Sequence, residues 1–449
     1  MLEQPLVTFG GLVVGLALPP IFLHVDYQPG IGLHVGSTSV HLFLSDFAVL
    51  AVGLAGLALG LVAGFRPLRA GLPVWVFGAA FLAFVFAATF YPLARSGPYD
   101  WRTHVVTAGK FAEYGLLAVA LPLLVRHRRD LSLLLSALVA WSLGATTVGV
   151  IQFFGGSISG GWPAGRRQPS FLGHHDFAAL SGAALALGLV AIALPAWRVN
   201  RGLAVAAGLS GMVGLVVSGS TAGAIGLAVG AGAAAGIAAL RGALSLRRLL
   251  ALGAISAIVL AGVVSLRSGD FDQFLRFFGV RRHETVTQRN VQTYVQHTLL
   301  DYIGLRIFLG HPAVGAGWQA SEKEPTVYER YLPAAHRRFP HAAPLSFPSP
   351  AHPYGIQNAY VQALADLGIV GFVLFVGLLA TGLYRAGCSA LRAPPAAAAP
   401  ALVAGVWLLV AMGIWSAVGL VAGIPLDALF WLALGLAATV AAGALHETA

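Results

Sequence analysis

The chain is dominated by long apolar segments separated by short polar connections. A helix needs about 20 apolar residues to cross the hydrocarbon core of a bilayer, and twelve of these segments are long enough to do so. They lie at residues 6–25, 39–64, 73–92, 104–125, 132–154, 175–195, 203–219, 222–240, 248–266, 358–384, 400–421 and 424–444. Only 10% of the 449 residues are charged, whereas soluble domains average about 25%. We therefore expect an all-α polytopic membrane helical bundle with about 12 transmembrane helices.

One polar stretch interrupts this pattern and divides the chain into three parts. Residues 1–266 would hold transmembrane helices 1–9, residues 267–357 a large loop, and residues 358–449 helices 10–12. The loop is rich in arginine and carries six histidines, namely His283, His297, His311, His336, His341 and His352. Because a lipid-facing surface cannot host so many ionisable groups, we expect recognition or chemistry to reside in this loop.

The arginines of the short connections predict the orientation. Twelve fall on one side of the bundle: Arg66, Arg69, Arg126, Arg128, Arg129, Arg198, Arg201, Arg241, Arg247, Arg248, Arg385 and Arg392. Four fall on the other: Arg95, Arg102, Arg166 and Arg167. Basic loops stay in the cytoplasm. We therefore expect a multi-pass protein of the cytoplasmic (inner) membrane with both termini cytoplasmic and the large loop extracytoplasmic.

Cysteine content and net charge narrow the kinds of site and partner that this protein can have. The single cysteine, Cys388, excludes an internal disulfide and a thiolate metal cluster. A net charge of +10 often indicates nucleic-acid binding. Here the arginines are scattered among hydrophobic spans, which instead favours membrane lipids or an anionic substrate as partners and no nucleic acid.

Three ionisable residues fall inside predicted spans. Asp46 lies early in the second, and Lys110 and Glu113 share one face of the fourth. One interpretation is a neutralised group that locks helices together. The other is a proton or ion relay, as in a secondary transporter or flippase.

The loop contains a predicted helix of its own. From residue 285 to 308 apolar side chains recur at Val291, Val295, Leu299, Tyr302 or Ile303, and Ile307, which is a helical period. We expect an amphipathic helix that rests on the outer leaflet or packs on the bundle. Residues 325–353 are rich in proline, which predicts irregular structure.

Three short motifs resemble one known family. The run 310–317, GHPAVGAG, is similar to the "HPxxGxG" element of the O-antigen ligase and O-antigen polymerase superfamily. Residues 357–371, QNAYVQALADLGIVG, resemble its "HNxYLQxLxxxGxxG" element, and residues 167–176, RQPSFLGHHD, resemble its "RxxGxFxNPN" loop. Twelve spans with a large loop between the ninth and tenth also resemble the lipopolysaccharide O-antigen ligase. Five positions would form the structural motif: His311, Pro312, Gly315, Gly317 and Asn358.

The resemblance implies a metal-independent, inverting glycosyltransferase without a cofactor. Its donor would be a glycan on undecaprenyl diphosphate, and its acceptor a sugar hydroxyl of lipid A-core or another glycan. A polysaccharide polymerase that joins lipid-linked repeat units is the close alternative. Arginine can bind a diphosphate leaving group through two parallel hydrogen bonds, and neutral histidine suits a general base at neutral pH.

Carried over to this sequence, the resemblance singles out two groups of side chains. Arg289, together with Arg166 or Arg167, would bind the donor diphosphate. His352 or His341 would be the catalytic base. Alternatively, Arg289 contacts lipid headgroups and His352 belongs to a hydrogen-bonded turn beside Pro353.

The sequence departs from the family at two positions. Thr221 stands where the family carries an arginine after the seventh span, and Gln357 replaces the histidine that precedes the motif asparagine. The diphosphate site must therefore be assembled from other residues. Asp270 and Asp272 imitate the D-x-D of metal-dependent transferases, but we expect no metal site.

Overall fold

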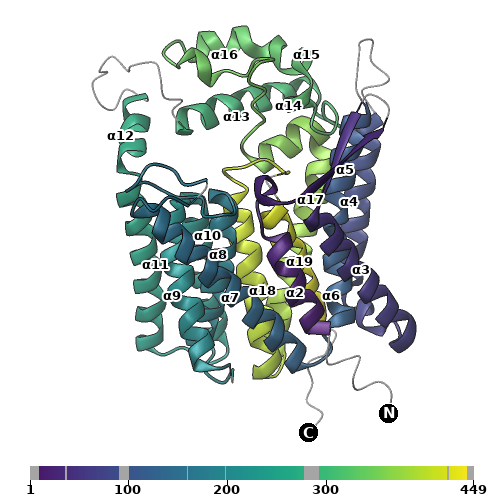
Figure 1. The fold of residues 1–449 in the computed structure, drawn as a ribbon, viewed down its shortest axis with the longest axis vertical. Coiled ribbons are helices and arrows are strands. Elements are labelled where there is room, and N and C mark those ends of the chain that lie inside the picture. The colour runs from purple at the N-terminus through teal and green to yellow at the C-terminus, as the bar shows by residue number, and fades with distance from the viewer. Residues whose placement is uncertain are drawn as a thin grey trace.

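The structure is a computed structural model that describes residues 10–35, 38–90, 101–158, 160–197, 199–277, 293–421 and 424–441. Within these ranges almost every element is a helix, which confirms the predicted all-α membrane fold. Figure 1 shows a bundle of long helices with a group of shorter helices above one end.

Ten helical segments of the described chain are long and apolar enough to span a membrane, and two shorter apolar helices accompany them. The ten are α3 (Leu44–Ala63), η2 with α4 (Arg66–Gly71, Leu72–Phe90), α5 with α6 (Trp101–Glu113, Gly115–Leu124), α7 (Arg128–Phe153), α8 (His174–Ala193), α9 (Arg201–Ser218), α10 (Thr221–Leu240), α11 (Leu246–Leu266), α17 (Ala359–Arg392) and α18 (Pro395–Ile414). The shorter two are α2 (Gly10–Ile21) and α19 (Ile424–Ala441). Each predicted span overlaps one of these segments.

Helices α8, α18 and α19 form the centre of the bundle, and residues 425–440 of α19 are all buried. The membrane-spanning windows of α8 and α18 are 89% and 83% buried, whereas that of α11 at the periphery is 17% buried. Close backbone contacts between helices rest on glycine, as at Gly226 of α10, where a Cβ would lie 3.0 Å from the Val410 Cα of α18. Small residues permit such approaches, which supply the van der Waals contact that holds membrane helices together.

A β-hairpin precedes α3 and was not predicted. After the short helix η1 (Val25–Tyr27), β1 (Gly30–Val35) and β2 (Thr38–Phe43) pair antiparallel, with Gly30 opposite Phe43. The predicted second span began at residue 39 and was therefore wrong by five residues, because α3 begins at Leu44. The Asp46 carboxylate accepts a 2.7 Å hydrogen bond from the Phe43 N–H and so fixes the start of the helix.

The charged group inside the second and fourth spans is a local cluster. Lys110 of α5 forms an ion pair with Asp46 of α3, and its ammonium lies 5.6 Å from the centre of the Phe43 ring. The Glu113 carboxyl group lies beside Asp46 as well. These contacts join α3, α5 and the hairpin, so they suit the helix-locking interpretation.

The polar stretch after α11 forms the group of helices above the bundle (Figure 1). Its elements are α12 (Ser268–Phe277), α13 (Thr293–Gly310), α14 (Ala320–Lys323), α15 (Pro325–Tyr328), η4 (Glu329–Tyr331), α16 (Leu332–Arg338) and η5 (Pro344–Ser346). The prediction of irregular structure over residues 325–353 was therefore wrong in part. Pro325, Pro333 and Pro344 sit at the first positions of their helices, where the missing N–H has no helical partner to lose.

The predicted amphipathic helix is α13, which ends at Gly310 before the His311-Pro312 pair. Its apolar stripe, including Leu299, Ile303 and Ile307, is buried with Tyr328 and Phe347 in a small core that belongs to the loop itself. The helix also contacts α17. The loop is thus a compact cap on the bundle, and the first eight residues of the predicted helix lie outside the described residues.

Candidate functional site

A polar cavity of about 470 Å³ lies where the cap meets the bundle. Its walls come from the α7–α8 connection, α13, the α14 region, the segment before α17 and the α18–α19 connection. They comprise Arg167, His174, His175, Gln296, His297, Gln319, Glu322, Pro353, Tyr354, Gly355, Ile356, Gln357, Gln362, Ala417, Val418, Gly419 and Val421. Segments more than 240 residues apart in sequence, 167–175 and 417–421, therefore meet at one site.

Arg167 lines the cavity, and a second guanidinium, that of Arg267, lies near it without forming part of the cavity wall. The guanidinium carbon of Arg167 lies 4.8 Å from the centre of the Trp162 ring. Arg267, just after α11, is only 7% exposed and lies 4.7 Å from the centre of the Tyr294 ring. Burial and the nearby Arg267 lower the pKa of Arg167 to about 10, so Arg167 remains charged at neutral pH.

The charge of this pair is only partly compensated. Arg267 Nε donates to Asp270 Oδ2 at 2.8 Å, and Nη1 approaches the Gly219 carbonyl at 3.5 Å. Its buried Nη2 has no hydrogen-bond partner among the described residues. Buried donors are normally satisfied. Two adjacent guanidiniums with an open N–H are the arrangement expected of a phosphate or carboxylate site.

Arg267 also accounts for the absent arginine at position 221. The Thr221 hydroxyl is 3.1 Å from the Tyr294 hydroxyl, and the same tyrosine ring lies beneath the Arg267 guanidinium. The end of α11 thus supplies a positive group next to the start of α10. Asp270, one of the two residues that imitate the D-x-D motif, forms an ion pair with Arg267.

Three imidazoles line the cavity beside the arginines. The His174 and His175 rings lie 3.8 Å apart, and the His174 ring is 5.1 Å from that of Trp162. His297 comes from α13. Burial, with Arg267 and Arg167 nearby, lowers the pKa of His297 to about 4, so this imidazole is neutral at pH 7. A neutral ring can donate to an anion or accept a proton without adding to the positive charge.

Glu322 and two glutamines provide different chemistry. The Glu322 carboxylate lies against Gly355, where a Cβ would be 2.3 Å from its Oε2. Its Oε1 accepts a 2.7 Å hydrogen bond from Lys323 Nζ. Gln296 Nε2 and Gln319 Oε1 are buried without partners in the described part of the chain. A free donor and a free acceptor of this kind suit the hydroxyls of a sugar.

Gln319 has an unusual backbone conformation. Its φ of 54° lies in the left-handed region, which residues other than glycine rarely adopt. Strain of this kind persists where the surroundings hold the residue in place. Here Glu322 N–H donates to the Gln319 carbonyl at 3.2 Å, so the turn presents both side chains to the cavity.

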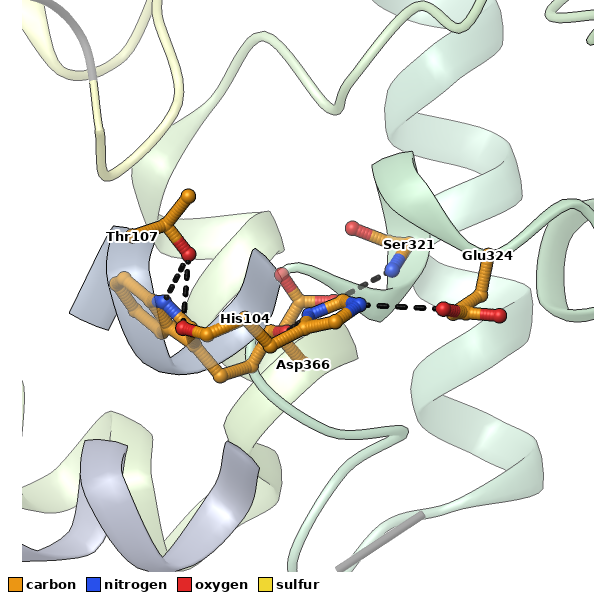
Figure 2. A network of polar contacts seen from close by, with 6 residues as sticks. His104, Thr107, Ser321, Glu324 and Asp366 are labelled. Atoms are coloured by element: carbon orange, nitrogen blue, oxygen red, sulfur yellow. Dashed lines mark hydrogen bonds and ion pairs between the residues drawn. The ribbon is translucent and has the colours of Figure 1, made fainter. Parts of the chain in front are cut away.

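A buried polar network holds this turn against the bundle (Figure 2). His104 Nδ1 lies 2.5 Å from the Trp318 carbonyl, and its Nε2 lies 3.1 Å from Glu324 Oε1. Trp318 Nε1 donates to the Thr107 hydroxyl at 3.1 Å. On the other side Ser321 N–H donates to Asp366 Oδ1 at 2.9 Å. The segment that carries Gln319 and Glu322 is therefore fixed to α5 and to α17.

Two of the motifs interlock through their backbones. α17 is interrupted at Gly368, whose φ of 64° and ψ of −167° are not helical. The carbonyls of Ala365 and Asp366 accept from Ala316 and Gly317, and the N–H groups of Ile369 and Val370 donate to Pro312 and Ala313. The turn after α13 therefore satisfies the backbone groups that the break exposes.

Asn358 has two contacts at the start of α17. Its Oδ1 accepts from the Tyr360 and Val361 N–H groups at 3.1 and 3.3 Å, which is an N-cap. Its Nδ2 donates to Asp301 Oδ2 of α13 at 3.2 Å. This residue therefore ties the cap to the helix that begins beneath it.

The sequence-predicted site residues lie in different places. Arg167 lines the cavity, whereas the neighbouring Arg166 is exposed and does not. His341 and His352 are exposed and absent from the cavity wall, although the His352 ring stacks 6.0 Å from that of Tyr354 at the rim. Arg289 lies outside the described residues. His311 is half-buried, and its carbonyl accepts from Gly315 N–H at 3.0 Å.

Arg267, His297 and Glu322 were not singled out from the sequence. The signal for Arg267 was its place at the end of a span beside the predicted loop. His297 could have been selected because α13 has a helical period and one of its faces must meet the bundle. No sequence signal distinguishes Glu322 from other acidic residues of the loop.

Asp301 offers a test of the α13–α17 contact. Burial raises the pKa of Asp301 from 3.8 to about 6, against the opposing effect of the Asn358 hydrogen bond. A raised pKa gives stability that is present below pH 3.8 and lost as the pH rises through about 6. Asp301→Asn, which keeps an acceptor for Asn358, should therefore raise the unfolding temperature more at pH 7 than at pH 4. Glu329→Gln, at an exposed cap position, is the control; an equal shift at both pH values for Asp301→Asn would contradict this account.

Comparison with known proteins adds one finding. Residues 205–376 match a family model described as O-Antigen ligase. The match covers the chain from α9 to the first part of α17, and so includes Arg267, His297 and Glu322. No curated protein matches the chain.

Proposed function

Because the chain belongs, through residues 205–376, to the O-antigen ligase superfamily, we propose that it is a membrane glycosyltransferase that uses a polyprenyl-diphosphate-linked glycan. The glycan would move from undecaprenyl diphosphate to a hydroxyl of lipid A-core or of another glycan. In keeping with the arginine distribution, the cavity would face the outside of the inner membrane. The observation that carries this proposal is the Arg167 guanidinium in the wall of a polar cavity, with Arg267 near it and sugar-binding groups on the other walls.

The arginine end suits the leaving group. When the bond between the anomeric carbon and the diphosphate breaks, negative charge develops on the departing oxygen. Arg167 and the open N–H of Arg267 would stabilise that charge in a partly dehydrated site. Neutral His297 would donate a further hydrogen bond. Two guanidiniums in this position need no metal ion to balance the diphosphate.

Glu322 suits the attacking group. In an inverting displacement the acceptor oxygen attacks on the face opposite the leaving diphosphate, so its base must lie away from the arginines. Glu322 enters the cavity from the α14 turn and lies against Gly355, whereas His297 has Arg267 and Arg167 nearby, so Glu322 is the better candidate for that base. The acceptor oxygen would form the new bond to the anomeric carbon, its proton would pass to the Glu322 carboxylate, and the old bond would release the diphosphate. Gln296 and Gln319 would hold sugar hydroxyls.

Replacing the base separates this proposal from a histidine mechanism. Glu322→Gln should keep donor binding and slow glycan transfer by about 10²–10⁴, the range for losing general acid–base catalysis. His352→Ala and His341→Ala should stay close to the parent rate, because neither ring lines the cavity. Transfer rates with purified donor and acceptor, in parallel with donor-binding titrations, measure both effects. A large loss in His352→Ala with an active Glu322→Gln would return the base to His352.

A polymerase remains the second candidate within the same chemistry, because only the acceptor differs. A cavity with one basic end and amide-lined walls accommodates a free glycolipid or a second lipid-linked glycan equally well. A transporter is less well supported. Its candidate residues Asp46, Lys110 and Glu113 contact one another beside the hairpin and do not line the polar cavity.

A further inference from the structure

A second cavity, of about 910 Å³, lies at the end of the bundle opposite the cap. Figure 1 places the connection between α8 and α9 at that end. The lining residues come from α8, this connection, α9 and one position of α11. They are Leu185, Gly188, Ala191, Ile192, Pro195, Trp197, Val199, Asn200, Arg201, Ala204, Val205, Gly208, Leu209, Met212 and Ile255.

Small residues create the hollow. Gly188 of α8 packs against Gly208 of α9, where a Cβ on Gly188 would lie 2.9 Å from the Gly208 Cα. A Cβ on Gly208 itself would meet nothing within 4 Å, so this glycine borders open space. Val205 and Leu209 are more than half exposed on the same helix. The cavity is therefore an apolar recess in the wall of the bundle, and its lining suits a hydrocarbon chain better than water.

The recess has one cationic residue on its wall. Arg201 is the first residue of α9 and is exposed. The Asn200 side chain accepts from Gly202 and Leu203, so it caps the helix and leaves the guanidinium unengaged by the cap. Trp197, half-buried beside it, is of the residue type that settles at the membrane–water boundary. An apolar recess with a tryptophan and a cation near the boundary matches the two parts of an acidic lipid.

We propose that this recess binds one acidic phospholipid of the leaflet opposite the cap, with an acyl chain along Gly208 and the phosphate group at Arg201. A phospholipid of that leaflet holds its phosphate at the depth of the α8–α9 connection and directs its chains toward the bundle centre. The charge complementarity with Arg201 selects an anionic headgroup over a zwitterionic one. The bound lipid would brace α9, whose far end holds the Gly219 carbonyl against Arg267.

Binding can be measured without any assay of transfer. The full-length protein, stripped of lipid in detergent, would be titrated with phosphatidylglycerol, phosphatidylethanolamine and undecaprenyl phosphate, and adducts counted by native mass spectrometry. We expect one tightly retained phosphatidylglycerol. Arg201→Gln should weaken it about fivefold, since a single arginine near an anionic headgroup contributes about 1 kcal/mol. Gly208→Leu, which fills the recess, should abolish the retained adduct.

Matched controls are available at the same end and on a similar helix. Arg247→Gln removes an exposed arginine at the start of α11 outside the recess, and Gly236→Leu enlarges an exposed glycine of α10 with open space around it. Both should keep parent affinity. Equal binding of phosphatidylethanolamine, equal losses in the control variants, or preferential retention of undecaprenyl phosphate would overturn the proposal.

Discussion

Arg167→Ala is expected to lower the rate of glycan transfer by about 10²–10³, the cost of removing one preorganised group that stabilises developing negative charge. Arg167 lines the polar cavity and stands beside Arg267, which cannot take over both phosphate groups from its position over Tyr294. Arg167→Lys should recover only part of the loss, because an ammonium lacks the planar fork of a guanidinium. Initial rates at saturating acceptor, with donor concentration varied, measure the effect.

The adjacent residue provides the control. Arg166 has the same charge and lies in the same connection, but it is exposed and outside the cavity wall. Arg166→Ala should therefore transfer at close to the parent rate. If Arg166→Ala and Arg167→Ala lose the same activity, the effect belongs to the net charge of the connection and the cavity is not the diphosphate site.

Gly315→Ala is expected to release the cap from α17. Gly315 has a φ of 74°, and a Cβ there would lie 2.2 Å from the Asp366 carbonyl carbon. Left-handed backbone costs about 1–2 kcal/mol for other residues, and forced overpacking adds about 1–3 kcal/mol. The backbone hydrogen bonds that bridge the break at Gly368 would be lost with the displacement. Both thermal stability in detergent and transfer activity should fall.

Gly165→Ala separates the two contributions. Gly165 has a nearly identical φ of 73°, but a Cβ there meets nothing within 4 Å. This variant should show only the smaller cost of the left-handed backbone. If its loss of unfolding temperature equals that of Gly315→Ala, steric contact with α17 has no role and the interlock does not hold the cap.

Much of the fold could be predicted because the bilayer imposes a length. Apolar runs of about 20 residues specify helices whatever their packing, and the spans emerged at the predicted places. The hairpin was missed because residues 39–43 are as apolar as a helix start, and only the alternation of Thr38, Val40 and Leu42 indicates a strand. The prediction of irregular structure over residues 325–353 was wrong in part because the sequence does not distinguish a proline that begins a helix from one that breaks it.

The site was less predictable because it depends on which faces meet. Arg166 and Arg167 are adjacent residues of the same type, so the sequence does not distinguish them. The conformation of the α7–α8 connection places Arg167 in the cavity wall and Arg166 in solvent. His352 lies close to a motif in sequence yet outside the cavity wall, while His297 enters the cavity from the second turn of α13. Arg267 reaches the site because α11 ends beside Gly219, a contact between residues 48 positions apart.

The most direct measurement uses purified protein in proteoliposomes, with a fluorescent glycan on undecaprenyl diphosphate, a glycolipid acceptor and EDTA. We predict that the parent protein releases undecaprenyl diphosphate as glycan appears on the acceptor or on a second donor, which distinguishes a ligase from a polymerase. Arg166→Ala should do the same, and folded Arg167→Ala should leave the donor intact. Donor that the parent protein does not consume, or that Arg167→Ala consumes equally fast, would contradict the assignment of the cavity as a diphosphate-glycan transfer site.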